Sequence, residues 1–256
     1  MNLTREQLLA EMGITPLWRL RDAPVAGPGG ENDTAKAAPA ATREPEIAVP
    51  ATKPALPDVA VDALDWPDLA TRVAQCKACP LCEQRKQAVL GVGDREPDWL
   101  FIGEGPGAEE DIKGEPFVGQ AGKLLDNMLA ALGIARGDKV YIGNAVKCRP
   151  PGNRTPEAGE MAACRPWLER QIALLRPKVI VLLGKAAVHS LLHDDSSLAS
   201  LRGRRFEYQG IPVVVTYHPA YLLRNLPEKA KAWEDLLFAR RYLRETLATG
   251  GSELPF

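Results

Sequence analysis

The sequence contains neither a long apolar run nor a large excess of charge of one sign, and these shortages exclude several classes of protein. No window approaches the roughly 18 consecutive apolar residues of a membrane-spanning helix. The N-terminus lacks the basic and then apolar order of a secretory leader, so we expect a cytoplasmic protein with no membrane partner. The formal net charge is only −1, but this total conceals different charge balances in two parts of the chain.

Charge and aromatic residues are unevenly distributed along the chain. Residues 1–65 hold 6 Lys and Arg against 10 Asp and Glu, which leaves 26 against 23 of the chain's 32 and 33 for residues 66–256. That remainder is mildly basic and permits contact with nucleic acid. Residues 23–65 are rich in Ala, Pro and Gly and contain no aromatic residue, so they are predicted to form a flexible linker. Residues 1–22 are predicted to carry a short amphipathic helix that packs on the folded domain or frays; the alternative is a peptide that docks on a protein partner. Residues 249–256 are predicted to form a tail.

Residues 66–248 alternate between apolar runs and helical patterns. This alternation predicts an α/β fold: a three-layer α/β/α sandwich with a central four-stranded, mainly parallel sheet, preceded by a disordered N-terminal extension. The predicted strands are 99–103, 140–146, 179–183 and 213–216. The predicted helices are 68–75, 120–132, 156–175, 185–192 and 228–247.

The few cysteines are clustered in a way that is typical of metal ligation. Cys76 and Cys79 form a C-x-x-C pair, Cys148 follows the second predicted strand, and Cys164 lies in the helix after it. A close pair with two distant thiols is compatible with either zinc or a 4Fe–4S cluster. Cys82 extends the pair to C-x-x-C-x-x-C, so the spacing alone leaves the ligand set open. Buried free thiols are the alternative interpretation.

A glycine-rich acidic loop follows the first predicted strand. Gly103, Gly105 and Ala108 match the G-x-G-x-x-A pattern of dinucleotide-binding proteins. We reject that interpretation because a proline lies inside the turn, residues 109–111 are acidic, and the next ten residues are not predicted to form a helix. Such a loop is better suited to positioning water or stabilising developing positive charge. Phe117, just downstream, is either a core residue or a stacking platform for a flat ligand.

Further candidates lie at the ends of predicted strands. His218 follows the fourth strand, at the same edge of the sheet as the glycine loop, so a functional role is preferred to a structural one. Asn144 lies in the second strand, where its amide needs a partner and offers the donor and acceptor that a pyrimidine edge requires. Leu222 and Leu223, followed by Arg224, resemble an apolar wedge for stacked bases; alternatively they pack under the last helix.

Together these motifs resemble the family-4 (iron–sulfur, type-4) uracil-DNA glycosylases of the uracil-DNA glycosylase superfamily. The resemblance covers about residues 70–245, with the motifs in the expected order. The family's HP-x5-R motif is similar to the segment from His218 to Arg224, where the arginine comes one place earlier. The family's GE[AG]PG, ED, PFVG-AGK and KCRPP motifs are matched by residues 103–107, 110–111, 116–123 and 147–151.

The resemblance implies a DNA-repair enzyme. It flips deoxyuridine out of DNA and hydrolyses the N-glycosidic bond, releasing uracil and leaving an abasic site. Uracil-containing DNA is then the partner, and we expect a monomer. The resemblance also implies that Cys76, Cys79, Cys148 and Cys164 hold a 4Fe–4S cluster, with zinc less favoured and Cys82 a bystander.

The same resemblance implies the parts of a base pocket. The flipped uracil is expected to stack on Phe117 and to pair its O4/N3 edge with Asn144. His218 would donate a hydrogen bond to uracil O2, and Glu104 with the N–H of Gly105 would line the same oxygen. Family-1 relatives carry an Asp beside the glycine turn, where this chain has Gly105. The role of that Asp must therefore be taken by another residue or be absent.

The remaining expected roles concern the sugar and the DNA backbone. Glu110, and secondarily Asp111, is expected to stabilise the positive charge on the sugar or to orient water. Leu222 and Leu223 would fill the gap left by the flipped nucleotide, and Arg224 or nearby lysines would hold a phosphate. A relative that cross-links itself to DNA has a His-bearing insert that residues 144–153 lack, which argues against that chemistry.

Two other functions fit parts of the sequence. One is a non-catalytic DNA-binding or polymerase-associated module on the same fold. The other is a nucleotide-binding enzyme stapled by zinc.

Overall fold

The computed structural model describes residues 60–249, and the structural statements below concern that part of the chain. The predicted helix in residues 1–22 and most of the predicted linker and tail lie outside the described residues. Within the last residues assigned to the linker, a short 3-10 helix, η1 (Val61–Ala63), precedes Leu64, which is buried. Leu64 packs with Leu69 and Val73 of the first α-helix, so packed structure begins slightly earlier than the predicted boundary at residue 66.

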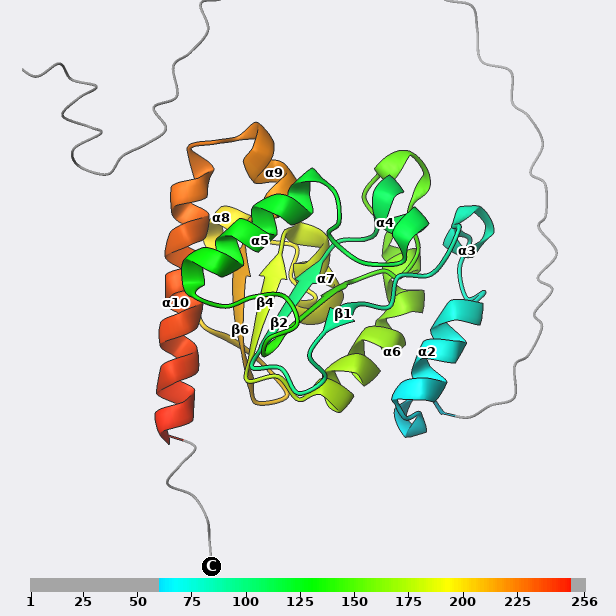
Figure 1. Cartoon of the computed structure of the whole chain (residues 1–256), viewed down its shortest axis with the longest axis horizontal. Coiled ribbons are helices and arrows are strands. Elements are labelled where there is room, and N and C mark those ends of the chain that lie inside the picture. Colours follow the sequence, from blue (N-terminus) through cyan, green and yellow to red (C-terminus); the bar gives the residue numbers. More distant parts are fainter. Residues whose placement is uncertain (1–59, 250–256) are drawn as a thin grey trace, which may run out of the picture. The chain divides into compact units, whose positions relative to one another are not determined.

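The centre of the fold is a sheet of six strands in the order β1-β3-β2-β4-β6-β5 (Figure 1). The four inner strands are parallel, and β1 and β5 pair antiparallel at the two edges. The prediction of four strands was therefore wrong in number, although its four strands are the four inner ones. The strands are β1 (Val92–Gly93), β2 (Trp99–Gly103), β3 (Val140–Asn144), β4 (Val179–Leu183), β5 (Phe206–Tyr208) and β6 (Ile211–Thr216).

Helices cover both faces of the sheet, which confirms the predicted α/β class. They are α2 (Trp66–Gln75), α3 (Leu81–Gln84), α4 (Ala108–Lys113), α5 (Gln120–Leu132), α6 (Ala158–Leu175), α7 (Lys185–Leu192), α8 (Leu198–Leu201), α9 (Pro219–Arg224) and α10 (Glu228–Thr249), with a second 3-10 turn, η2 (Pro151–Asn153). Helix α4 corrects the expectation that no helix follows the glycine loop. It is only six residues long and ends at Gly114, whose φ of 77° lies in the left-handed region.

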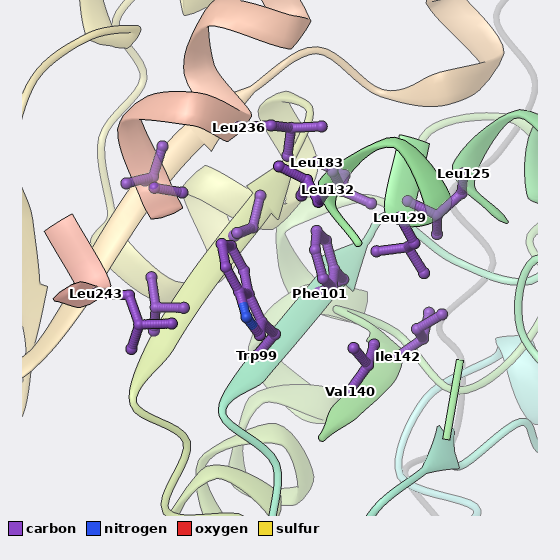
Figure 2. Close-up of a cluster of buried hydrophobic side chains, with 14 of the residues drawn as sticks. Trp99, Phe101, Leu125, Leu129, Leu132, Val140, Ile142, Leu183, Leu236 and Leu243 are labelled. Carbon is purple, nitrogen blue, oxygen red and sulfur yellow. The ribbon is translucent and has the colours of Figure 1, made fainter. Parts of the chain in front are cut away.

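The inner strands are apolar along their whole length because both of their faces are covered. In β2, Trp99 and Phe101 point to one face, where α5 and α10 contribute leucines (Figure 2). Leu100 and Ile102 alternate to the other face and pack with α6 and α7, including Leu168. The period-2 alternation of side chains in a strand thus supplies two hydrophobic cores from one apolar run.

Among the described residues, no helix combines the length and the apolar composition that crossing a membrane requires. The parallel strands β2, β3, β4 and β6 all end at one edge of the sheet. Loops that follow parallel strands gather at that edge, and there the fold places the residues discussed next.

Candidate active site

A hollow lies at the carboxyl edge of the sheet, among the loops that follow β2, β3, β4 and β6. Its walls come from segments more than 100 residues apart in the sequence. They include seven of the residues singled out in the sequence: Glu104, Gly105, Glu110, Phe117, Asn144, His218 and Arg224. The structure therefore brings the glycine loop and the segment after β6 to one place.

Asn144, the last residue of β3, supplies an unpaired acceptor to this hollow. Its side chain is 2% exposed, and its Oδ1 has no hydrogen-bond partner. Gly103 lies opposite Asn144 in the strand register. A Cβ atom on Gly103 would lie 2.5 Å from Asn144 Oδ1 and 2.5 Å from the ring of Phe117, so only glycine leaves room for both. A buried polar atom without a partner is costly, and this one lies where a ligand can satisfy it.

Phe117 is held in the wall of the hollow in an unusual backbone conformation. Its φ is 56°, which non-glycine residues rarely adopt, and its side chain is buried. Arg136 donates hydrogen bonds of 2.8 and 2.9 Å to the carbonyls of Pro116 and Phe117. A Cβ atom on Gly122 would lie 1.7 Å from the Phe117 oxygen. These contacts therefore hold the backbone that carries the ring, and backbone strain of this kind is common at functional sites.

His218 lies beside Phe117 and is neutral. The two rings stack with centroids 5.4 Å apart. Burial and, to a smaller extent, the charge of Arg224 lower the pKa of His218 to about 4, although Glu110 acts in the opposite sense. The Nδ1 atom accepts a hydrogen bond of 3.2 Å from the Ala220 N–H and caps α9. The ring proton is therefore on Nε2, which makes that atom a donor.

Two carboxylates belong to the hollow. Glu110 Oε1 accepts hydrogen bonds from the backbone N–H groups of Val118 (3.0 Å) and Gly119 (3.2 Å), which fix its position. Burial raises the pKa of Glu104, and a hydrogen bond with the Thr155 side chain opposes that rise. The loop carrying Thr155 was not singled out in the sequence, although it directly follows the K-C-R-P-P motif.

Asp111 lies outside the hollow. Its side chain is buried, accepts a hydrogen bond of 2.9 Å from the Lys86 N–H, and is absent from the lining of the hollow. The expectation of a secondary catalytic role for Asp111 is therefore corrected to a structural one. It follows Glu110 on a helix, where successive side chains point in different directions.

Helix α9 places the two leucines that were predicted to form a wedge in different environments. Leu222 is fully buried and packs with Tyr217 and Ala232, so it is not free to enter a DNA duplex. Leu223 is 41% exposed. The alternative, packing under the last helix, thus holds for Leu222, and Leu223 alone remains a wedge candidate. Tyr221, which was not singled out in the sequence, is also exposed and lines the hollow.

All five cysteines line a second, apolar cavity, and none forms a disulfide. Within residues 60–249, no three His, Cys, Asp or Glu side chains converge as ligands of a single metal ion. A 4Fe–4S cluster takes one thiolate per iron and so suits thiols spread around a larger body.

Hydrogen-bond donors contact two of the sulfur atoms of this cavity. Arg85 Nη1 lies 2.8 Å from Cys148 Sγ, and the Lys147 N–H donates to Cys164 Sγ at 3.2 Å. Burial lowers the pKa of the Lys147 ammonium and ionised Cys164 and Cys148 oppose that shift, with a net pKa of about 8. An all-sulfur donor set with cations beside it fits anionic, metal-bound thiolates better than neutral thiols.

Comparison with known proteins identifies the family. A family model described as the uracil DNA glycosylase superfamily matches residues 90–237, which is more than half of the chain. The chain belongs to the uracil DNA glycosylase superfamily. The matched region contains the hollow's lining from β2 to α9 as well as Cys148 and Cys164.

Individual members of the superfamily are also similar. The chain is 43% identical over 181 residues to a type-4 uracil-DNA glycosylase of Thermotoga maritima. The aligned region covers 69% of this chain and 94% of the Thermotoga protein. It is 42% identical over 198 residues to a type-4 enzyme of Saccharolobus solfataricus, covering 74% and 88%. A type-5 uracil-DNA glycosylase of Pyrobaculum aerophilum is 29% identical over 192 residues, covering 62% and 84%. The similarity is thus greater to these two type-4 members than to this type-5 member.

Proposed function

We propose that this protein is a uracil-DNA glycosylase of the type-4 branch of the superfamily. It takes deoxyuridine out of DNA, hydrolyses the N-glycosidic bond and leaves an abasic site. The observation that carries the proposal is the unpaired, buried Asn144 Oδ1 in the same hollow as Phe117 and the neutral His218. Those three side chains supply an acceptor, an aromatic face and a donor for one flat, polar ring.

Base recognition follows from these three groups. Phe117 provides the surface on which the flipped base stacks, an interaction worth about 1–3 kcal/mol. Asn144 Oδ1 accepts from uracil N3–H, and its amide nitrogen donates to O4. Cytosine carries an acceptor at N3 and a donor at C4, so it would present the wrong polarity at both atoms.

Bond cleavage leaves negative charge on the uracil ring and positive charge on the sugar. His218 Nε2–H donates a hydrogen bond to uracil O2, and Gly105 N–H and Glu104 lie at the same oxygen. A neutral histidine serves here because the developing charge is stabilised by donation without a full proton transfer. Water supplies the hydroxyl that C1′ gains, and its proton goes to the departing uracil.

Glu110 is the carboxylate that acts on the sugar side. Two backbone N–H groups hold it in the hollow, so its charge is preorganised before DNA binds. It stabilises the oxocarbenium-like sugar or orients the attacking water. At the edge of the hollow, Leu223 fills the space left by the flipped nucleotide and Arg224 holds a phosphate.

The cysteine cavity is the site of a 4Fe–4S cluster held by Cys76, Cys79, Cys148 and Cys164. When bound, the cluster supplies iron–thiolate bonds that staple the loop after α2 to the segment around α6. Cys82 lines the same cavity and is not a ligand in this proposal. Visible absorbance of the purified protein distinguishes the cluster from zinc, which is colourless.

The decisive experiment is a glycosylase assay on an oligonucleotide with one uracil, followed by cleavage of abasic sites. Wild-type protein is expected to release uracil, and His218→Ala and Asn144→Ala to lose at least a hundredfold in rate. His189→Ala is the matched control because His189 pairs with Asp195 and is absent from the lining of the hollow. DNA binding without uracil release by wild-type protein would instead support a non-catalytic module.

A further inference from the structure

Lys147 is a buried lysine that lies between the cysteine cavity and the base pocket. Its side chain is 1% exposed. It lines the cysteine cavity, is followed directly by Cys148, and donates its backbone N–H to Cys164 Sγ. At the other end of the side chain, Nζ donates a hydrogen bond of 2.7 Å to the backbone carbonyl of Asn144. One residue therefore contacts both sites.

A buried ammonium needs an anion nearby. Removing such an ion from water costs several kcal/mol unless opposite charge faces it. In the described part of the chain, none of the ion pairs between basic side chains and carboxylates includes Lys147. Lys147 instead lines the cavity that holds the thiols, directly precedes Cys148 in the chain and contacts Cys164 Sγ through its backbone N–H. Metal-bound thiolates at these two cysteines would be the nearby anions. The charge of Lys147 therefore belongs with the sulfur site.

The other end of Lys147 fixes the peptide group that follows Asn144. That peptide consists of the Asn144 carbonyl and the Ala145 N–H. The carbonyl accepts from Lys147 Nζ, and the N–H donates to the Gly103 carbonyl at 2.9 Å. Both polar groups of one peptide are thus held, which sets the backbone angle that aims the Asn144 side chain.

We propose that Lys147 is a positioning residue that ties the base-reading Asn144 to the cysteine site. Its ammonium balances the charge of the metal-bound thiolates and at the same time holds the Asn144 carbonyl. Loss of the anionic sulfur site would therefore loosen the peptide that aims Asn144. This inference rests on the proposed function, because it assigns uracil recognition to Asn144.

Arg85 offers a matched control for charge. Its Nη1 lies 2.8 Å from Cys148 Sγ, and its Nη2 donates to the Ala74 carbonyl at 2.7 Å. It thus places positive charge at the same sulfur site as Lys147, but its hydrogen bonds go to Cys148 and Ala74, whereas Lys147 Nζ bonds the Asn144 carbonyl. Removing either cation should lower the reduction potential of the cluster, whereas only Lys147 should affect base recognition.

The test compares Lys147→Met, Arg85→Met, Asn144→Ala and the double variant Lys147→Met/Asn144→Ala in the full chain. Binding is measured to duplexes with 2′-fluoro-deoxyuridine, which resists hydrolysis, or thymidine at one position. Iron content, visible absorbance and reduction potential are measured on the same samples. Lys147→Met is expected to keep its iron, to shift the potential downward, and to lose at least tenfold of the preference for the uracil duplex. Arg85→Met is expected to shift the potential and keep that preference.

The double variant decides whether Lys147 acts through Asn144. It is expected to match Asn144→Ala within twofold. The proposal is overturned if Lys147→Met keeps the full preference for the uracil duplex. It is also overturned if the losses of preference add in the double variant, or if Arg85→Met loses as much preference as Lys147→Met. If Lys147→Met fails to load iron, Lys147→Gln, whose amide stops one atom short of the ammonium, is judged by the same criteria. Wild-type protein with neither uracil preference nor uracil release overturns the proposed function itself, a result distinct from a deficit confined to the variants.

Discussion

At the scale of single residues, His218 shows how burial prepares a group for chemistry. A histidine in water is partly protonated near neutral pH, whereas this one is neutral because burial lowers its pKa to about 4. A neutral ring with its proton on Nε2 can donate to a developing oxyanion throughout the physiological range. The same burial makes His218 a source of pH-dependent stability.

We therefore predict an effect of His218 on acid stability. Between about pH 6.5 and pH 4 the unfolded chain binds a proton at this residue that the folded chain does not, so stability falls as the pH falls. The contribution is roughly 3 kcal/mol. His218→Asn, which keeps an acceptor for the Ala220 N–H, should remove that part of the pH dependence. Urea unfolding of wild type and variant at pH 7 and pH 4 measures this difference. Equal losses of unfolding free energy in the two proteins on going from pH 7 to pH 4 would contradict the prediction.

A second prediction concerns Gly103. The added methyl group of Gly103→Ala would lie 2.5 Å from both Asn144 Oδ1 and the Phe117 ring. We expect the variant to lose at least a hundredfold in uracil release, because either displaced group spoils the base pocket. Gly133→Ala is a useful comparison for stability, since that glycine has a φ of 77° but no atom within 4 Å of an added Cβ. It should destabilise the fold modestly and leave the rate per folded molecule unchanged.

At the scale of elements, the inner strands were predictable and the edge strands were not. The apolar run that predicts residues 179–183 coincides with β4 because a strand buried on both faces must be apolar throughout. Strand β1 has only two residues and strand β5 three, too few to show any periodicity. The sequence nevertheless contains a turn residue, Gly210, just after β5. In the structure Gln209 and Gly210 both have positive φ, as a two-residue hairpin turn requires.

Helix α9 gives a prediction that separates stability from DNA contact. Leu222→Ala empties a fully buried position and should cost about 2–5 kcal/mol of unfolding free energy. Leu223→Ala should leave stability within about 0.5 kcal/mol. It should slow excision from double-stranded DNA at least fivefold more than excision from single strands, where no base stack has to be filled. Denaturant unfolding and paired excision assays measure these effects, and equal slowing on both substrates would argue against a wedge.

At the scale of the whole molecule, the cysteine cavity connects distant parts of the chain. Cys76 and Cys79 follow α2, whereas Cys148 and Cys164 belong to the segment from β3 to α6. Bonds from these four thiolates to one cluster would close a loop of more than 80 residues. A metal cluster that binds only the folded state adds its binding free energy to the free energy of unfolding.

Iron content should therefore distinguish the ligands from the remaining cysteine. We expect Cys76→Ser to lose iron and visible absorbance and to lower the melting temperature by at least 10 °C. Cys82→Ser should keep the iron, the absorbance and the melting temperature within 3 °C. Iron loss in Cys82→Ser with retention in Cys76→Ser would show that the loop supplies a different pair of ligands.

The sequence by itself determined the α/β class, the four inner strands and seven of the residues that line the candidate site, because buried strands and loop motifs depend on local composition. The tertiary structure decided what those residues can do. Glu110 and Asp111 are adjacent in sequence, yet Glu110 lies in the hollow whereas Asp111 accepts a hydrogen bond from the Lys86 N–H outside it. Leu222 and Leu223 divide in the same way between core and surface. Lys147 begins the K-C-R-P-P motif, but the motif gave no signal for the role proposed here, because the contacts of Lys147 with Asn144 and Cys164 exist only in the folded chain.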